Sequence, residues 1–279
     1  MTVHERVSVH DVTFLGARPA ELQRIWTTLG VRRLSVIDTQ FLEPEFRHLL
    51  DGGEYLIQAI CHVFGAGRVP ADESSVAAAR AALSRLIDAA AAAGATCIYL
   101  LTGGRGEFGW EQAAERFSDA IEPCVREAAQ AGVSLAIENA SSLYADIHMA
   151  HSLRDTITLA ETAGLDICID LFHCWAEADL GGQLRSALPR TRLIQLSDYV
   201  LGDRALPARA VPGDGVIPIE TIVAQALTDG YEFGFDLELL GPRIDAEGRL
   251  AAARRGCEVV GAMLDRLGGA DVEESGGIR

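Results

Sequence analysis

The stretch Leu165-Asp166-Ile167-Cys168-Ile169-Asp170-Leu171-Phe172-His173 alternates apolar residues with smaller or polar ones, which predicts a buried strand. The strand ends on the carboxylate of Asp170, and the imidazole of His173 follows three residues later. An ionised carboxylate is costly to bury unless a group of opposite charge lies beside it. The stretch therefore predicts a cation next to Asp170, with a metal ion as the leading candidate, and directs attention to the other strands for matching ligands.

Similar β-type runs alternate with helical segments along the whole chain. Eight strand–helix units match a (β/α)₈ barrel, which typically takes about 250 residues. The runs are Val7–Phe14, Val31–Asp38, Tyr55–Phe64, Thr96–Thr102, Val133–Glu138, Leu165–Asp170, Arg192–Asp198 and Phe233–Leu239. No G-x-G-x-x-G follows the first run, which disfavours a doubly wound open sheet.

Glycines mark the ends of five of the intervening helical segments. A glycine with positive φ is the usual way to end a helix. These glycines are Gly30, Gly94, Gly132, Gly164 and Gly230. We therefore predict a single TIM barrel over residues 1–267, followed by a disordered tail over residues 268–279. The long loop Val200–Gly215 follows the seventh strand and is expected to lie over the barrel mouth.

The last four predicted strands each have one bulky apolar face and one small or polar face, as a closed barrel requires. The inward residues at their carboxyl ends are Glu138, Asp170, Gln195 and Glu238. Three carboxylates in one barrel mouth repel one another strongly unless a cation neutralises them. The sequence therefore predicts one divalent metal ion held by these four residues. An all-oxygen donor set suits Mn²⁺ or Mg²⁺ better than Zn²⁺.

The composition excludes several other functions. The formal net charge of −16 disfavours nucleic-acid backbones and anionic membrane surfaces as partners. The chain shows no signal-peptide pattern and no apolar run of membrane-spanning length. Its six cysteines include no C-x-x-C pair, which indicates free thiols in a reducing compartment. We expect a cytoplasmic protein without nucleic-acid or membrane partners.

Five short motifs in the second half of the chain resemble the xylose-isomerase-like TIM barrels, and the resemblance runs from the first strand to the eighth in order. That superfamily includes sugar isomerases and epimerases, inosose dehydratases, 3-dehydroshikimate dehydratases and the endonuclease IV group. The motifs are Ala136-Ile137-Glu138-Asn139, Ile169-Asp170-Leu171-Phe172-His173, Gln195-Leu196-Ser197-Asp198, Arg209-Ala210-Val211-Pro212-Gly213-Asp214-Gly215 and Phe235-Asp236-Leu237-Glu238. An endonuclease needs many metal-binding histidines, which this chain does not place at the matching positions.

The resemblance assigns roles residue by residue. It implies that Glu138 and Glu238 bind the metal and flank the substrate, and that Asp170 is a further ligand. It also implies that His173 contacts a substrate oxygen and that Arg209 binds the substrate. Gln195 departs from the pattern, because most members have histidine there. With glutamine at this position, the chain resembles the 3-dehydroshikimate dehydratase branch.

Two further residues are candidates for substrate binding. His62 shares the parity of Gln58 and Ile60 near the end of the third predicted strand. Its side chain is expected either to face the pocket or to pack in the core. Arg105 lies in a glycine-rich loop after the fourth predicted strand and could bind an anionic group, or the loop could simply be flexible.

The predicted activity is that of a metal-dependent isomerase or epimerase of a small, carbohydrate-like hydroxy-ketone. Glu138 or Glu238 would act as the base next to a metal-polarised carbonyl. One alternative is a dehydratase of a cyclic polyol ketone, with His173 as the acid for the departing hydroxyl. Another is a barrel that binds its ligand without turnover. Relatives of this kind often form homo-oligomers, and only that analogy bears on the oligomeric state.

Overall fold

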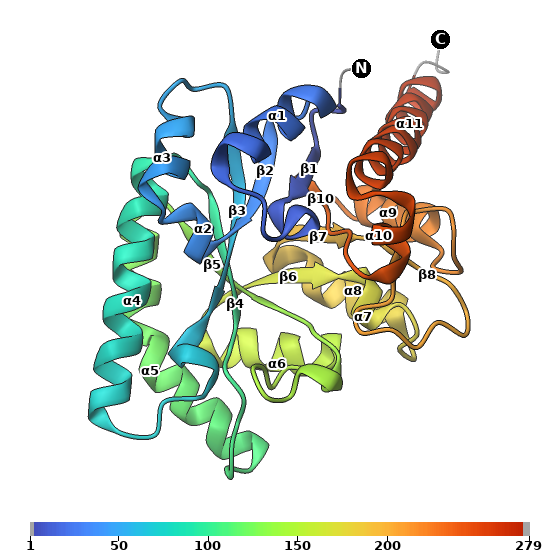
Figure 1. Ribbon diagram of the computed structural model, residues 1–279. Helices are drawn as coiled ribbons and strands as arrows, with labels where there is room; N and C mark the ends of the chain where they lie inside the picture. The colour runs from blue at the N-terminus through green and yellow to red at the C-terminus, as the bar shows by residue number, and fades with distance from the viewer. Residues whose placement is uncertain (1–2, 276–279) are drawn as a thin grey trace.

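The structure is a computed structural model that describes residues 3–275, with side chains described up to residue 268. Eight parallel strands close into a barrel in the order β1-β10-β7-β6-β5-β4-β3-β2 (Figure 1). They are β1 (Val7–His10), β2 (Arg33–Ile37), β3 (Leu56–Val63), β4 (Cys97–Leu101), β5 (Ser134–Glu138), β6 (Asp166–Asp170), β7 (Thr191–Leu196) and β10 (Phe235–Leu237). The predicted TIM barrel is confirmed.

Helices surround the barrel, with the long α4 and α5 together on one side and α11 away from them (Figure 1). The helices are α1 (Pro19–Leu29), α2 (Asp38–Phe41), α3 (Pro44–Leu50), α4 (Glu73–Ala92), α5 (Trp110–Ala131), α6 (Leu153–Ala163), α7 (Leu171–Cys174), α8 (Leu180–Ala187), α9 (Ile219–Thr228), α10 (Pro242–Glu247) and α11 (Arg249–Ser275). Short 3₁₀ helices occur at η1 (Asp11–Phe14), η2 (Phe64–Gly67), η3 (Ser142–Tyr144) and η4 (Leu188–Arg190). All five predicted helix-ending glycines have positive φ, between 68° and 89°.

The strands separate two hydrophobic layers. The larger layer packs between the barrel and the helices and contains residues such as Ile60, Ile137 and Ile169. The smaller layer fills the barrel interior with Ala59, Cys97, Tyr99, Ala136, Cys168 and Leu193. Small residues suit this layer because a closed eight-stranded barrel leaves little room inside. The alternation therefore directs the last residue of each inward series to the carboxyl-terminal mouth.

Some predicted boundaries differ from the observed ones. The first predicted strand, Val7–Phe14, ends at His10 because the chain turns into η1, where Asp11 accepts a hydrogen bond from the Ile37 amide (3.1 Å). α11 extends to Ser275, into the segment predicted as a tail, and residues 276–279 lie outside the described part of the chain. All six cysteines are free. None of the described helices is long and apolar enough to cross a lipid bilayer.

The loop after β7 is ordered by a single aspartate. Within it, β8 (Asp198–Tyr199) pairs antiparallel with β9 (Arg209–Ala210). The Asp198 carboxylate accepts hydrogen bonds from the amides of Gly213 (2.9 Å), Gly215 (2.9 Å) and Ile217 (3.0 Å). A Cβ on Gly215 would lie 2.2 Å from the Tyr199 carbonyl oxygen, so only glycine fits there. This hairpin carries Arg209 to the barrel mouth.

Candidate active site and metal centre

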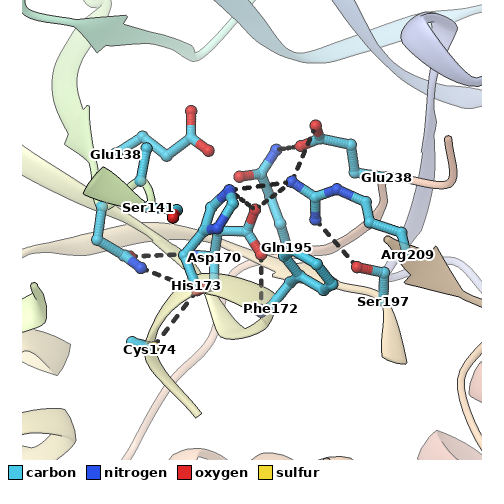
Figure 2. A network of polar contacts seen from close by, with 12 residues as sticks. Glu138, Ser141, Asp170, Phe172, His173, Cys174, Gln195, Ser197, Arg209 and Glu238 are labelled. Carbon is cyan, nitrogen blue, oxygen red and sulfur yellow. Dashed lines mark hydrogen bonds and ion pairs between the residues drawn. The ribbon is translucent and has the colours of Figure 1, made fainter. Parts of the chain in front are cut away.

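The four predicted ligands converge at the mouth of the barrel, as Figure 2 shows. Asp170 and Gln195 are register partners on β6 and β7 and are fully buried. Glu138 and Glu238 line a cavity of about 200 Å³ above them, together with His173 and Arg209. Drug-sized pockets measure about 300–1,000 Å³, so this cavity suits a small substrate. A larger surface groove of about 420 Å³ between α4 and α5 contains none of the predicted site residues.

Arg209 is the cation at the centre of this site. Its Nη2 donates to Asp170 Oδ2 at 2.6 Å and lies 3.2 Å from Glu238 Oε1, while Nη1 donates to Ser197 Oγ at 2.9 Å. Its guanidinium carbon lies 4.8 Å from the centre of the Phe172 ring. Burial raises the pKa of Asp170, but the charge and hydrogen bond of Arg209, together with His173 and the Phe172 amide, outweigh it, and the net pKa lies below the usual value. Asp170 is therefore held ionised.

Glu138 is in the opposite situation. It is 6% exposed, and no described residue donates a hydrogen bond to its carboxylate, which is drawn without contacts in Figure 2. Burial, followed by the charges of Glu238 and Asp170, raises the pKa of Glu138 well above its usual value. Burial also raises the pKa of Glu238, against the opposing effect of Arg209. Arg209 alone therefore does not neutralise the three carboxylates.

This donor set fits a divalent ion. Glu138, Asp170 and His173 each offer a ligand atom, and these atoms lie within 4.8 Å of one another. An unpartnered buried carboxylate beside a second carboxylate is the environment that a bound cation stabilises. His173 thus joins the candidate ligands, whereas the sequence analysis assigned it to the substrate.

Gln195 has its amide nitrogen turned toward the carboxylates. Nε2 donates to Glu238 Oε2 (2.5 Å) and to the Tyr99 hydroxyl (3.3 Å), while Oε1 accepts from the Cys168 thiol (3.4 Å). A metal would be bound by the amide oxygen, because the amide nitrogen has no free lone pair for it. Gln195 would have to turn its amide over to become a ligand. In this structure it orients Glu238.

His173 lies next to Asp170, with 3.5 Å between Nε2 and Oδ2. Burial lowers the pKa of His173 to about 4, against the raising effect of Asp170. The imidazole is therefore neutral at pH 7, and it can offer one N–H donor or one free nitrogen, but not the charge of an imidazolium.

Residues behind the ligands fix their backbones. The Asn139 side chain donates to the Asp170 carbonyl oxygen (2.9 Å) and accepts from the Asp170 amide (2.9 Å), which clamps the ends of β5 and β6 together. His148 Nε2 lies 2.9 Å from the Glu138 carbonyl oxygen, and its Nδ1 accepts from the Thr102 amide at 3.0 Å. Burial lowers the pKa of His148 to about 3, so it serves as a neutral hydrogen-bonding group.

Two predicted substrate-binding residues are not brought to the cavity. His62 alternates with the inward Cys61, points toward the helices, and lies 2.5 Å through Nδ1 from Asp38 Oδ2. The parity assigned to it was off by one, because the inward series on β3 is Ala59 and Cys61. Arg105 is exposed and donates to the Phe108 carbonyl oxygen within its own loop.

Among the cavity-lining residues that the sequence analysis missed are His10 and Tyr99. The His10 Nε2 lies 2.7 Å from the Tyr99 hydroxyl, which in turn contacts Gln195. Tyr99 could have been found from its inward parity on β4. Its position among apolar neighbours makes it look like an ordinary core residue.

Comparisons with known proteins agree with this fold. The family described as "Xylose isomerase-like TIM barrel" matches residues 20–261. Protein SMc04130 from Sinorhizobium meliloti 1021 is 25% identical, with 91% of this chain and 98% of that chain covered and a TM-score of 0.78. A search of the curated proteins finds no match.

Two more distant structures share the fold. An L-ribulose 3-epimerase is 17% identical over 100% of this chain and 99% of its own, with a TM-score of 0.77. The IOLI protein, solved with a bound zinc atom, is 14% identical over 94% of this chain and 97% of its own, with a TM-score of 0.76.

Proposed function

The chain belongs to the xylose isomerase-like TIM barrel family, and from the geometry of its cavity we propose that it is a divalent-metal-dependent isomerase or epimerase of a small sugar-like hydroxy-ketone. The observation that carries the proposal is the pair Glu138 and Glu238, which line one cavity from opposite ends of the carboxylate network (Figure 2). Two carboxylates on either side of a substrate can remove a proton from carbon and return one to it.

The two glutamates differ in what holds them. Glu238 is oriented by Arg209 (3.2 Å) and by the Gln195 amide (2.5 Å), which favour its ionised form. Glu238 therefore acts as the base that removes the proton beside the substrate carbonyl. Glu138 faces the same cavity from the other side, where it is placed to exchange a proton with the neighbouring carbon or with the opposite face of the same carbon.

The candidate ligands for the ion are Glu138, Asp170, His173 and Glu238, with Gln195 able to join them if its amide turns over. A divalent ion bound there would polarise the substrate carbonyl and acidify the adjacent C–H bond. Mn²⁺ and Mg²⁺ suit the oxygen donors, while the His173 nitrogen also suits Zn²⁺. The sugar-acting epimerase and the zinc-bound relative of the same fold support both parts of the proposal.

The test is exchange of substrate hydrogen with solvent. The protein is incubated in D₂O with Mn²⁺, Mg²⁺ or Zn²⁺ and each of a set of ketopentoses and ketohexoses, and deuterium next to the carbonyl is measured by NMR. We expect metal-dependent uptake together with an isomer or epimer. Glu238→Gln should abolish the uptake, and Glu232→Gln, an exposed glutamate two residues before the buried segment of that strand begins, is the matched control. Uptake that persists in Glu238→Gln would refute the role of Glu238.

Gln195 favours a second candidate, a dehydratase of a cyclic polyol ketone, because glutamine at this strand end resembles the 3-dehydroshikimate dehydratase branch. Incubation with 3-dehydroshikimate and Mn²⁺ or Mg²⁺, followed by absorbance of protocatechuate, tests this reading directly. Formation of protocatechuate without deuterium exchange into any ketose would replace the first proposal with the second.

A further inference from the structure

The cavity has two chemically different sides, each formed by a continuous set of strands. β10, β7, β6 and β5 are consecutive neighbours in the barrel and supply the carboxylates and the amide; we call them the acidic arc. β4, β3, β2 and β1 complete the circle, and we call them the apolar arc. Apart from Cys61, Tyr99 and His10, the cavity residues of the apolar arc are Val12, Ile37 and Leu101.

Three loop residues extend this apolar surface around the cavity. Ile147 follows β5, Pro207 lies in the loop that carries Arg209, and Leu240 follows β10. We call the six residues the apolar wall: Val12, Ile37, Leu101, Ile147, Pro207 and Leu240. Each of the six is only partly buried, so apolar surface faces the cavity where a bound molecule would cover it.

The cavity also has no spare positive charge among the residues described. Arg209 is committed to Asp170 and Glu238. Burial lowers the pKa of His10, but the neighbouring Asp11 (3.2 Å) and Asp236 raise it to about 9, so His10 is a second cation of the lining, and Asp11 already pairs with it. Its lining contains no lysine and no second arginine within the described chain. Three carboxylates would balance Arg209 together with one divalent ion. A phosphate or carboxylate on the substrate would therefore enter a buried site without a counter-charge, which is costly.

We propose, building on the proposed function, that the substrate is an uncharged hydroxy-ketone with an apolar segment, such as the methyl group of a deoxy sugar, lying against the apolar wall. The carbonyl and the reacting hydroxyls face the acidic arc, and the segment without hydroxyls faces Ile37 and Leu101. A hydroxyl placed there would lose its water and gain no partner from the six wall residues. Of the polar groups of the same arc that line the cavity, His10 and Tyr99 are already bonded to each other, and the Cys61 thiol is only a weak donor and acceptor. The proposal thereby disfavours sugar phosphates and 3-dehydroshikimate, which is a carboxylate.

The experiment compares matched ligands on the Mn²⁺-loaded protein by titration calorimetry. Each trio contains a 6-deoxyketohexose, the ketohexose of the same configuration, and the 6-phosphate of that ketohexose. We expect the best deoxy sugar to bind about 5- to 100-fold more tightly than its parent, which corresponds to the desolvation of one unpaired hydroxyl. We expect the phosphate to bind more weakly than both.

Variants of the wall make the test specific. Leu101→Asn and, separately, Leu240→Asn place an amide at the wall and should reduce or reverse the preference for the deoxy sugar. Leu143→Asn is the matched control, since Leu143 is 67% exposed near the same mouth but does not line the cavity. Two positions are used so that a folding defect in one variant does not decide the result.

The outcomes separate this inference from the proposed function. Equal or tighter binding of the parent sugar, tighter binding of the phosphate, or no binding of any neutral sugar would overturn the inference. Tighter binding of the deoxy sugar without any deuterium exchange would support the role of the apolar wall and reject the proposed isomerase or epimerase activity. Deuterium exchange into all neutral ketoses, without tighter binding of the deoxy sugar, would support the proposed activity and reject the role of the apolar wall.

Discussion

The acidic arc and the apolar arc use the same strand geometry for opposite purposes. At the end of β6, Asp170 is fully buried and needs Arg209, Ser197 and the Asn139 clamp around it to be stable. At the ends of β2 and β4, Ile37 and Leu101 need no partner at all. The acidic arc therefore holds charged groups that can act on a substrate, while the apolar arc determines the shape of the cavity. Chemistry should depend on the first and selectivity on the second.

The largest expected effect separates catalysis from binding. Glu238→Gln should lower kcat by about 10²- to 10⁴-fold, the usual contribution of a general base. Leu101→Ala in the apolar arc should act mainly through KM, because it removes contact area that is present in both ground and transition states. Steady-state kinetics on a ketose found by deuterium exchange measures both. A loss of kcat of similar size in the two variants would show that catalysis and binding are not separated between the two arcs.

The next effect concerns the buried cation. Arg209→Met leaves Asp170 and Glu238 without their shared partner, and breaking a buried ion pair in this way costs about 3–5 kcal/mol. We expect a large fall in Tm in the presence of a chelator. Mn²⁺ should raise Tm more in this variant than in the unaltered protein, because the ion then supplies the missing positive charge.

Arg255→Met is the control for that comparison. Arg255 also pairs with two carboxylates, Asp214 and Glu247, but its side chain is 37% exposed, and exposed ion pairs contribute at most about 1 kcal/mol. Differential scanning calorimetry with and without Mn²⁺ measures all three proteins. Equal losses in Arg209→Met and Arg255→Met would mean that the acidic arc is not held by Arg209.

A smaller effect tests a polar link between the two arcs at the cavity. Tyr99 rises from β4 in the apolar arc, and its hydroxyl meets both His10 (2.7 Å) and the Gln195 amide (3.3 Å). Tyr99→Phe leaves both groups with an unmet hydrogen bond, at a cost of about 1–3 kcal/mol. It should also free the Gln195 amide to turn its oxygen toward the carboxylates, so Mn²⁺ affinity measured by calorimetry should rise as stability falls. Unchanged metal affinity would show that Tyr99 does not set the amide orientation.

The contrast between the arcs also explains what the sequence could predict. Glu138, Asp170 and Glu238 were predictable because a carboxylate on the inward parity of a buried strand is chemically conspicuous. Val12, Ile37 and Leu101 were not, because an apolar residue at a strand end looks the same whether it faces core or cavity. His62 was assigned to the wrong face of β3. The pairing of β3 with β2 is irregular before it, because Leu34 pairs with Ile57 while the next residue, Ser35, pairs with Ala59.

The contacts between different strands and loops could not be predicted from the sequence, for a different reason. Arg209 was assigned to the substrate by resemblance, but its pairing with Asp170 depends on a hairpin whose geometry is set by Asp198 and three distant amides. The orientation of the Gln195 amide depends on Tyr99, which is 96 positions away in the chain. Local patterns identify the chemical groups, and only the closed barrel decides which groups meet.

The smallest expected effect concerns the pH dependence of stability. Burial and neighbouring charges hold the pKa of Glu138 above its ordinary value of 4.5, so the folded state binds this proton more tightly than the unfolded chain does. The resulting stabilisation is fully present below pH 4.5 and is lost as the pH rises through the raised folded pKa. Glu138→Gln removes this dependence, so in chelator it should gain on the unaltered protein as the pH rises. The change is about 1.4 kcal/mol for each unit by which the pKa is raised.

Chemical denaturation between pH 4.5 and 8.5 measures this difference, and the apolar arc supplies the contrast. Leu101→Ala removes no titratable group, so its difference from the unaltered protein should be independent of pH, and so should that of the exposed Glu232→Gln. Mn²⁺ should flatten the Glu138→Gln difference, because a bound cation favours the ionised glutamate over its protonated form. A Glu138→Gln difference that stays flat in chelator would mean that Glu138 is not strained in the folded protein, and the acidic arc would lose its distinction from the apolar one.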